Sequence, residues 1–287
     1  YDQATRGALY LYRDAAHLAV GLANARLLQE HGATIEALDV ERLAALEPAL
    51  AHMNGRLSGA LYAAEDESGD CRLFSLALAE RCRALGVAFR WNETVRSLAA
   101  EGERVRGVVT DRGRIEGDAF VLALGSYSPR VARSVGLGLP IYPVKGYSLT
   151  FPIRDARAAP VIPGVDEKYL VAYARLGDRL RVTATAEFAG YATGPRSRDF
   201  AVMTRVAREL FPDAADTERP EYWACLRPMT PDGPPLMGRT RHANLWLNTG
   251  HGHIGWTMAA GSGRIVADLI SGRKPEIDLT GLTLEGR

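Results

Sequence analysis

Cysteine, long apolar runs and net charge are all scarce in this chain. Three cysteines occur among 287 residues, none in a C-x-x-C pair, and their odd number argues against a disulfide framework. The uninterrupted apolar stretches, such as 120–124, are far too short to span a bilayer. A formal net charge of +1 provides no strong field for nucleic acid. These absences favour a protein of a reducing compartment, and we expect a cytoplasmic location.

The remaining composition is that of an ordinary globular protein. Hydrophobic residues make up 47% of the chain and charged residues 24%. A chain of this length can form one large domain or two ordinary ones, and it can bury most of its apolar surface without disulfides. Tyr1 opens directly into sequence that looks folded, without the basic and apolar regions of a signal peptide. We therefore expect the chain to start inside a longer protein.

The first half of the chain shows helix signals followed by short strands. Helices are predicted at 15–29, 40–46 and 73–85. Strands separated by turn residues are predicted at 7–12, 87–90, 94–99, 105–110 and 114–116. The apolar run 120–124 is continuous and not alternating, which predicts a strand buried on both faces of a parallel sheet. This order is typical of the later half of an α/β nucleotide-binding domain.

The second half predicts an antiparallel region and then a return to α/β structure. Strands 169–175 and 179–187 flank Gly177-Asp178, which is a hairpin signal. A helix is predicted at 200–210, and the strand 245–248 leads through a glycine-rich turn into a helix that ends near Ile270. The fold class is therefore α/β plus α+β.

The glycine-rich turn 250–255 matches G-x-G-x-x-G between a predicted strand and a predicted helix. The chain ends shortly after that helix, so the turn does not open a complete dinucleotide-binding βαβ unit. Its glycines allow a ligand to approach the backbone, and the N–H groups at the helix start favour an anion. A turn that only packs strand on helix is the alternative. His251 and His253 form an H-x-H pair, but no nearby Cys, Asp or Glu completes a metal site, and no metal is predicted.

A second feature is the segment 226–238, which is rich in proline and glycine and carries Arg227 just before Pro228. Because proline fixes φ, the segment is predicted to be a rigid loop. A rigidly held guanidinium suits bidentate binding of a carboxylate. An arginine that only hydrogen-bonds loop carbonyls is equally compatible with the spacing.

At these residues the sequence resembles the FAD-dependent D-amino-acid oxidase superfamily, and within it the bacterial D-amino-acid dehydrogenases. The motifs that carry the resemblance occur in the family's order and cover nearly the whole chain. They are DESGDC at 66–71, GSYS at 125–128, YPVKGYSLT at 142–150, LRPMTPDG at 226–233 and NTGHGHIGWTM at 248–258.

The resemblance implies an FAD-binding α/β domain, incomplete because it lacks the N-terminal βαβ, and a second, mainly antiparallel substrate domain. Segments 64–135 and 225–287 are expected in the first of these, and segments 1–63 and 136–224 in the second. The family's N-terminal strand, glycine turn and helix hold the FAD pyrophosphate. We therefore expect such a segment to be supplied in cis or by another chain, and this chain alone to bind FAD weakly or not at all.

The resemblance also assigns roles to individual positions. Arg227 falls at the family's substrate-carboxylate arginine, and Tyr147 and Tyr173 are candidates for the substrate pocket. The positions implied to contact FAD are Val95, Ala123, Gly125, Gly250, His251, Gly252, His253, Ile254, Gly255, Trp256 and Thr257. Position 253 departs from the family pattern, in which a small or hydroxyl residue is expected.

The implied activity is flavin-dependent oxidative deamination of D-amino acids to 2-oxo acids and ammonia. The implied partners are an amino-acid substrate and a non-oxygen electron acceptor, a quinone or a dye-like compound, with a peripheral contact on the inner face of the cell membrane. Two alternatives stay open. One is a glycine or sarcosine oxidase-like enzyme that uses O2, and the other is a non-catalytic, truncated or accessory chain that lacks FAD.

Overall fold

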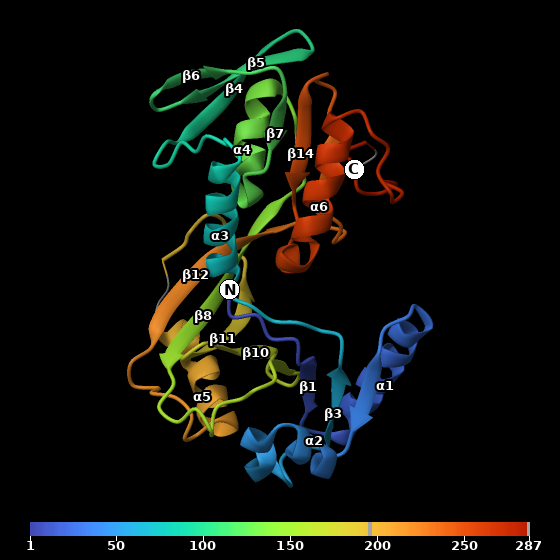
Figure 1. The fold of residues 1–287 in the computed structure, drawn as a ribbon, viewed down its shortest axis with the longest axis vertical. Coiled ribbons are helices and arrows are strands. Elements are labelled where there is room, and N and C mark those ends of the chain that lie inside the picture. The colour runs from blue at the N-terminus through green and yellow to red at the C-terminus, as the bar shows by residue number, and fades with distance from the viewer. Residues whose placement is uncertain (195–196, 286–287) are drawn as a thin grey trace. The chain divides into compact units, whose positions relative to one another are not determined.

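The computed structural model describes residues 1–194 and 197–285 as a mixed α/β fold (Figure 1). Its strands are β1 (Ala8–Tyr12), β2 (Ile35–Leu38), β3 (Gly59–Ala63), β4 (Val95–Glu101), β5 (Arg104–Thr110), β6 (Gly113–Glu116), β7 (Phe120–Leu122), β8 (Tyr142–Pro152), β9 (Gly164–Asp166), β10 (Val171–Leu176), β11 (Arg179–Glu187), β12 (Glu221–Met229), β13 (Leu236–Arg239) and β14 (Leu245–Thr249). Its α-helices are α1 (Ala15–Glu30), α2 (Val40–Leu46), α3 (Cys71–Ala84), α4 (Ser128–Ala132), α5 (Ala201–Leu210) and α6 (Gly255–Ile270).

The chain forms two compact units, and each is assembled from separate segments. The first unit consists of residues 1–86, 146–186 and 193–225. The second consists of residues 87–145, 187–192 and 226–287. The chain therefore passes between the units several times.

The first unit contains residues 64–86, which the sequence analysis places with the FAD-binding segments. The backbone of Ser68 pairs with that of Ala4. Asp70 caps the start of α3 and also accepts a hydrogen bond from Arg179 at 2.9 Å. These contacts with residues distant in sequence tie the segment to the first unit, and no local pattern reveals them.

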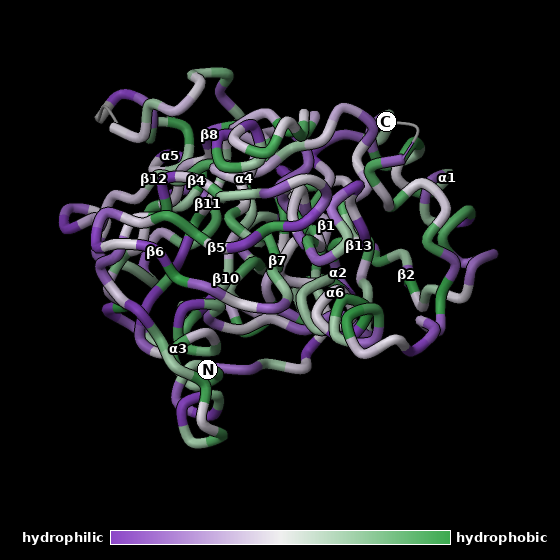
Figure 2. The backbone as a smooth tube through the Cα atoms, turned by 90° about the horizontal axis from the view of Figure 1, so that it is seen from above, coloured by the Kyte–Doolittle hydropathy of each residue, from purple (hydrophilic) through white to green (hydrophobic). Residues whose placement is uncertain are grey.

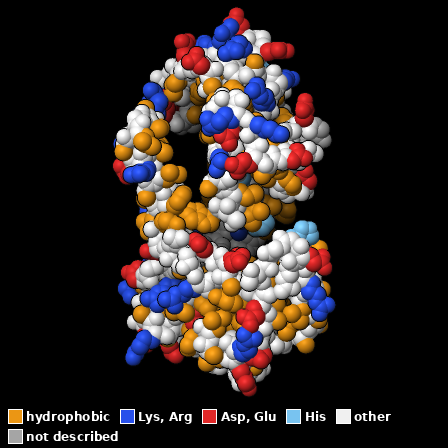
Figure 3. All heavy atoms as spheres, turned by 45° about the vertical axis from the view of Figure 1, so that its right-hand side comes forward, with side chains coloured by type: hydrophobic (Ala, Val, Ile, Leu, Met, Phe, Trp, Pro, Cys, Tyr) orange, Lys and Arg blue, Asp and Glu red, His pale blue; other side chains and the backbone are white. Residues whose placement is uncertain are grey.

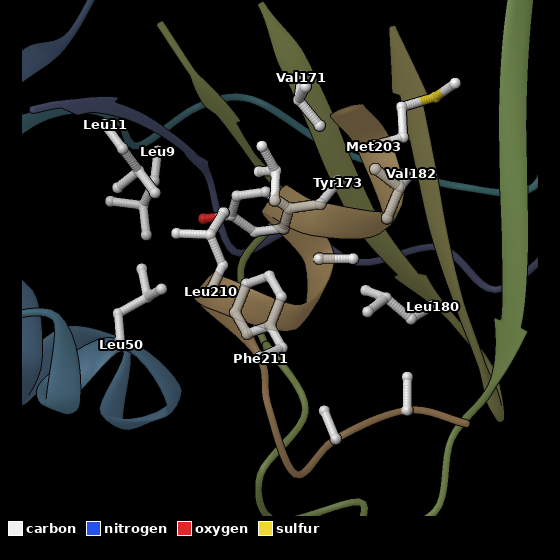
Figure 4. Packing of buried hydrophobic residues seen from close by; sticks show 14 of the residues in the cluster. Leu9, Leu11, Leu50, Val171, Tyr173, Leu180, Val182, Met203, Leu210 and Phe211 are labelled. Atoms are coloured by element: carbon white, nitrogen blue, oxygen red, sulfur yellow. The ribbon is translucent and has the colours of Figure 1, made fainter. Parts of the chain in front are cut away.

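An eight-stranded sheet with the order β12-β8-β11-β10-β9-β1-β3-β2 carries the core of the first unit. The predicted hairpin at Gly177-Asp178 is confirmed, because β10 and β11 pair antiparallel around it. The apolar face of α5 packs against the sheet through Met203, Val206 and Leu210. Figure 4 shows this core from close by.

The second unit contains two three-stranded sheets, with the orders β13-β14-β7 and β4-β5-β6. Strand β7 pairs with β14 in parallel, so 120–124 and 245–248 lie in one unit, as the sequence predicts. Residues 136–145 join this unit, and not the first, because Leu137, Leu139 and Ile141 pack in its core.

Two local predictions for the second unit are wrong. Residues 87–90 form no strand. Strand β7 covers only 120–122 and is not buried on both faces, since Val121 is 44% exposed. Val121 points to the exposed face of β7, whereas Phe120 and Leu122 on the opposite face are buried.

The surface agrees with the balanced composition. Acidic and basic side chains are both spread over the face drawn in Figure 3. Apolar and polar stretches alternate along the backbone in Figure 2. Within the described ranges, no helix has the length and apolar character needed to cross a bilayer.

Candidate flavin and substrate site

The candidate site lies in the second unit, where the parallel strands β7 and β14 end at the same sheet edge. Such carboxyl ends are where open α/β sheets bind ligands. The short 3-10 helix η2 (Gly125–Tyr127) follows β7, and the glycine-rich turn follows β14. Ser128 Oγ lies 2.9 Å from Thr249 Oγ1, which donates to the carbonyl of Gly125 at 3.2 Å. These hydrogen bonds hold the two strand ends together.

The turn after β14 requires glycine at two positions. Gly250 has φ +78° and Gly252 has φ +59°, both in the left-handed region. A Cβ at Gly250 would lie 3.0 Å from Cγ2 of Thr230, and one at Gly252 would lie 3.1 Å from Sδ of Met229. The turn is therefore held close against the residues at the end of β12.

Arg227 lies in strand β12, so the predicted loop over 226–238 is confirmed only for residues 230–235, between β12 and β13. Pro228 interrupts no ladder here, because β12 is the edge strand of its sheet. The carbonyl before Arg227, that of Leu226, accepts a hydrogen bond from Ser126 Oγ at 3.2 Å. The carbonyl after it, that of Pro228, accepts one from the N–H of Gly252 at 3.0 Å. Arg227 is half-buried, and the carbonyls on both sides of it are hydrogen-bonded to the segments that follow β7 and β14.

Helix α6 begins in the glycine-rich turn without a side-chain cap on its first residues. An uncapped helix start presents backbone N–H groups and the positive end of the helix dipole. His251 is half-buried, and its Nε2 lies 2.9 Å from Ser262 Oγ within the helix. Burial lowers the pKa of His251, which favours the neutral imidazole. His253 and Trp256 expose their side chains beside this helix start.

The position predicted for the adenine end of FAD lies near the same strand end. Val95, Val121 and Leu124 line a small cavity of about 100 Å³ in the second unit. Ala123 is exposed and Gly125 is half-buried. The second unit thus contains all the positions predicted to contact FAD, those in 95–125 and those in 250–257.

Tyr147 and Tyr173 do not lie in an open pocket, and the structure gives them packing positions in the first unit. Tyr147 is 1% exposed and meets Phe200 edge to face. Tyr173 is 3% exposed and packs in the same way on Phe211, as Figure 4 shows. Burial raises the pKa of Tyr173 well above its usual value, so its hydroxyl stays protonated. Both side chains belong to the buried core cluster of the first unit.

The chemistry of this sheet edge fits a flavin dinucleotide. The uncapped start of α6 suits an anion or a partly negative group. Asn248 Oδ1 at the end of β14 is buried without a hydrogen-bond partner in the described part of the chain, so it can accept from a ligand donor. The positive-φ glycines of the turn keep side chains away from the backbone.

Several residues of this arrangement escape sequence reasoning. Ser126 and Ser128 lie within the GSYS motif, but only the fold shows what their hydroxyls bind. Thr249, Asn248 and Ser262 give no signal of their own, because a small polar residue after a strand or within a helix is common. A cluster of small polar residues following both predicted parallel strands was the available clue.

Comparison with known proteins identifies the family of this chain. Residues 1–269 match the family of FAD dependent oxidoreductases. The chain is 46% identical over 285 residues to a D-amino acid dehydrogenase of Bradyrhizobium diazoefficiens, covering 99% of this chain and 68% of the relative. It is 47% identical over 287 residues to D-amino acid dehydrogenase 2 of Mesorhizobium japonicum, covering 100% and 69%.

Solved structures share the fold at low sequence identity. The chain superposes on glycine oxidase from Geobacillus kaustophilus with a TM-score of 0.90 and 22% identity, covering all of this chain and 76% of that one. L-proline dehydrogenase from P. horikoshii gives a TM-score of 0.83 at 18% identity, covering 96% and 74%. With the family match spanning nearly its whole length, the chain belongs to the FAD dependent oxidoreductases.

Proposed function

We propose that this chain forms the greater part of an enzyme that oxidises D-amino acids to 2-oxo acids and ammonia. The observation that carries the proposal is the double anchoring of Arg227. Turns from both parallel strand ends hydrogen-bond the carbonyls on either side of it, at Leu226 and Pro228. These bonds restrain the backbone on both sides of Arg227, next to the turns that follow β7 and β14. The relatives named D-amino acid dehydrogenase support the choice of substrate.

Arg227 binds the substrate carboxylate in this proposal, and the planar guanidinium fixes the orientation of the α-carbon. FAD, when bound, would supply the redox chemistry for removal of the α-hydrogen as hydride. Fixed orientation alone lowers a barrier by about 7–11 kcal/mol at best. The uncapped start of α6 stabilises negative charge near it, and the close turn Gly250–Gly252 excludes bulky side chains. The resulting imino acid is hydrolysed by water.

Substitution of Arg227 tests the proposal. In the intact flavoprotein, Arg227→Ala should lower kcat/KM for a D-amino acid by about 30-fold to several thousand-fold, since losing a charge-assisted contact costs about 2–5 kcal/mol. Arg227→Lys should also be poor, because a point charge cannot replace the planar fork. Arg157→Ala is the matched control, since the Arg157 side chain is 92% exposed.

Steady-state kinetics should be run on the amino acid and on the matching amine without a carboxylate. Flavin content, read from the visible spectrum, should stay unchanged. Equal harm to both substrates, or to neither, would mean that Arg227 is structural and that the carboxylate is held elsewhere.

We also propose a quinone or dye-like electron acceptor and a peripheral location on the inner face of the cell membrane. The names of the relatives, dehydrogenases and not oxidases, support the acceptor. Parallel assays of dye reduction and O2 consumption with one D-amino acid test it, and rapid O2 consumption would favour an oxidase. Co-sedimentation with anionic vesicles tests the membrane contact.

A further inference from the structure

The glycine-rich turn is fastened on two sides. On one side, the N–H of Gly252 donates to the carbonyl of Pro228, next to Arg227. On the other, the imidazole of His251 reaches Ser262 Oγ at 2.9 Å across two turns of α6. Ser262 and Val266 are the residues of α6 that the structure buries. The His251–Ser262 contact is therefore a partly buried attachment between the turn and its helix.

We propose that His251 is a positioning residue, whose hydrogen bond to Ser262 fixes the start of α6 relative to the strand that carries Arg227. The inference rests on the proposed function, because it takes the start of α6 as the surface that meets the flavin. It adds to the FAD contact that the motif implies for His251 a second role, in which the imidazole acts through its bond to the helix.

The geometry explains why a side chain is needed here. The first turn of α6 has no side-chain cap, so no capping hydrogen bond sets the angle at which the chain enters the helix. Both glycines of the turn have left-handed φ values, a region that gives the backbone little intrinsic preference. His251, which stands between them, provides the side-chain constraint. His251 also approaches Gly255 closely, since a Cβ added there would come within 3.1 Å of His251 Cβ.

The test compares His251→Leu, Ser262→Ala and the double variant in the intact protein. FAD itself is the probe, titrated into the apoprotein while the quenching of flavin fluorescence and the visible spectrum are recorded. Each single variant should raise the Kd for FAD about tenfold, the value of one buried neutral hydrogen bond. The double variant should be no worse than the weaker single one, because both changes remove the same bond.

Two further variants separate positioning from general stability. Ser262→Thr keeps the hydroxyl and should restore the Kd to within about threefold of the wild type. Ser271→Ala, an exposed serine at the other end of α6, should leave the Kd and the flavin spectrum unchanged. Thermal unfolding of each apoprotein should be measured in parallel.

Losses that add in the double variant, or variants that lower the apoprotein midpoint but bind FAD as the wild type does, would overturn the proposal. In those cases the wild type would still bind flavin and oxidise D-amino acids, so the proposed function would stand. A wild-type protein that neither binds flavin nor oxidises D-amino acids would overturn both.

Discussion

Ser126 provides a sharp prediction about how the fold positions the substrate arginine. Its side chain is 4% exposed, and its Oγ donates to the carbonyl of Leu226, immediately before Arg227. Ser126→Ala removes this donor and keeps the remaining anchor, the bond from Gly252 to Pro228. The guanidinium should stay in place on average but be held less firmly.

The magnitude follows from the contact that is lost. A neutral buried hydrogen bond contributes about 0.5–1.5 kcal/mol net, and at 3.2 Å this one is longer than the usual optimum. If the loss appears wholly in orientation of the carboxylate, kcat/KM for a D-amino acid should fall about 2- to 10-fold. This is far less than the loss expected for Arg227→Ala.

The assay is steady-state kinetics on a D-amino acid and on the matching amine, with flavin content determined for each preparation. Ser148→Ala is the matched control, since Ser148 is 1% exposed and its hydroxyl has no partner in the described residues. That control should keep wild-type kinetics. If Ser126→Ala slows the amine as much as the amino acid, the serine stabilises the unit and does not position Arg227.

Three further predictions concern stability and can be checked by urea unfolding. Gly252→Ala, at φ +59°, should cost about 1–2 kcal/mol because alanine is strained in the left-handed region. Arg13→Met should lower the free energy of unfolding by about 3–5 kcal/mol, since it leaves Asp166 buried at 0% exposure without its ion pair. Arg157→Met, at an exposed ion pair, is the control and should lower it by under about 1 kcal/mol. The hydrogen bond from Arg13 lowers the pKa of Glu209 in the folded protein. The stability that this bond provides is present above the usual carboxyl pKa and should be lost as pH falls through the lowered pKa of the folded state. Arg13→Met should flatten this pH dependence of the free energy of unfolding.

The sequence by itself determined the order of most elements and the family. Apolar residues, together with capping and helix-ending residues at their bounds, located α1, α2, α5 and α6. The Gly177-Asp178 pair likewise predicted the turn of the β10–β11 hairpin. The motif order identified the FAD dependent oxidoreductases, since rigid turns and glycines leave a mark in the residue types themselves.

Only the tertiary structure decided which of those residues share a site. The burial of Tyr147 in a sheet core depends on what packs above the strand, which the sequence of the strand does not reveal. Proline and glycine made 226–238 look like a loop, yet β12 tolerates Pro228 because it lies at a sheet edge. The anchoring of Arg227 needs Ser126 and Gly252, each far from it along the chain. Such contacts depend on which strand ends become neighbours, and this is decided when the sheet assembles.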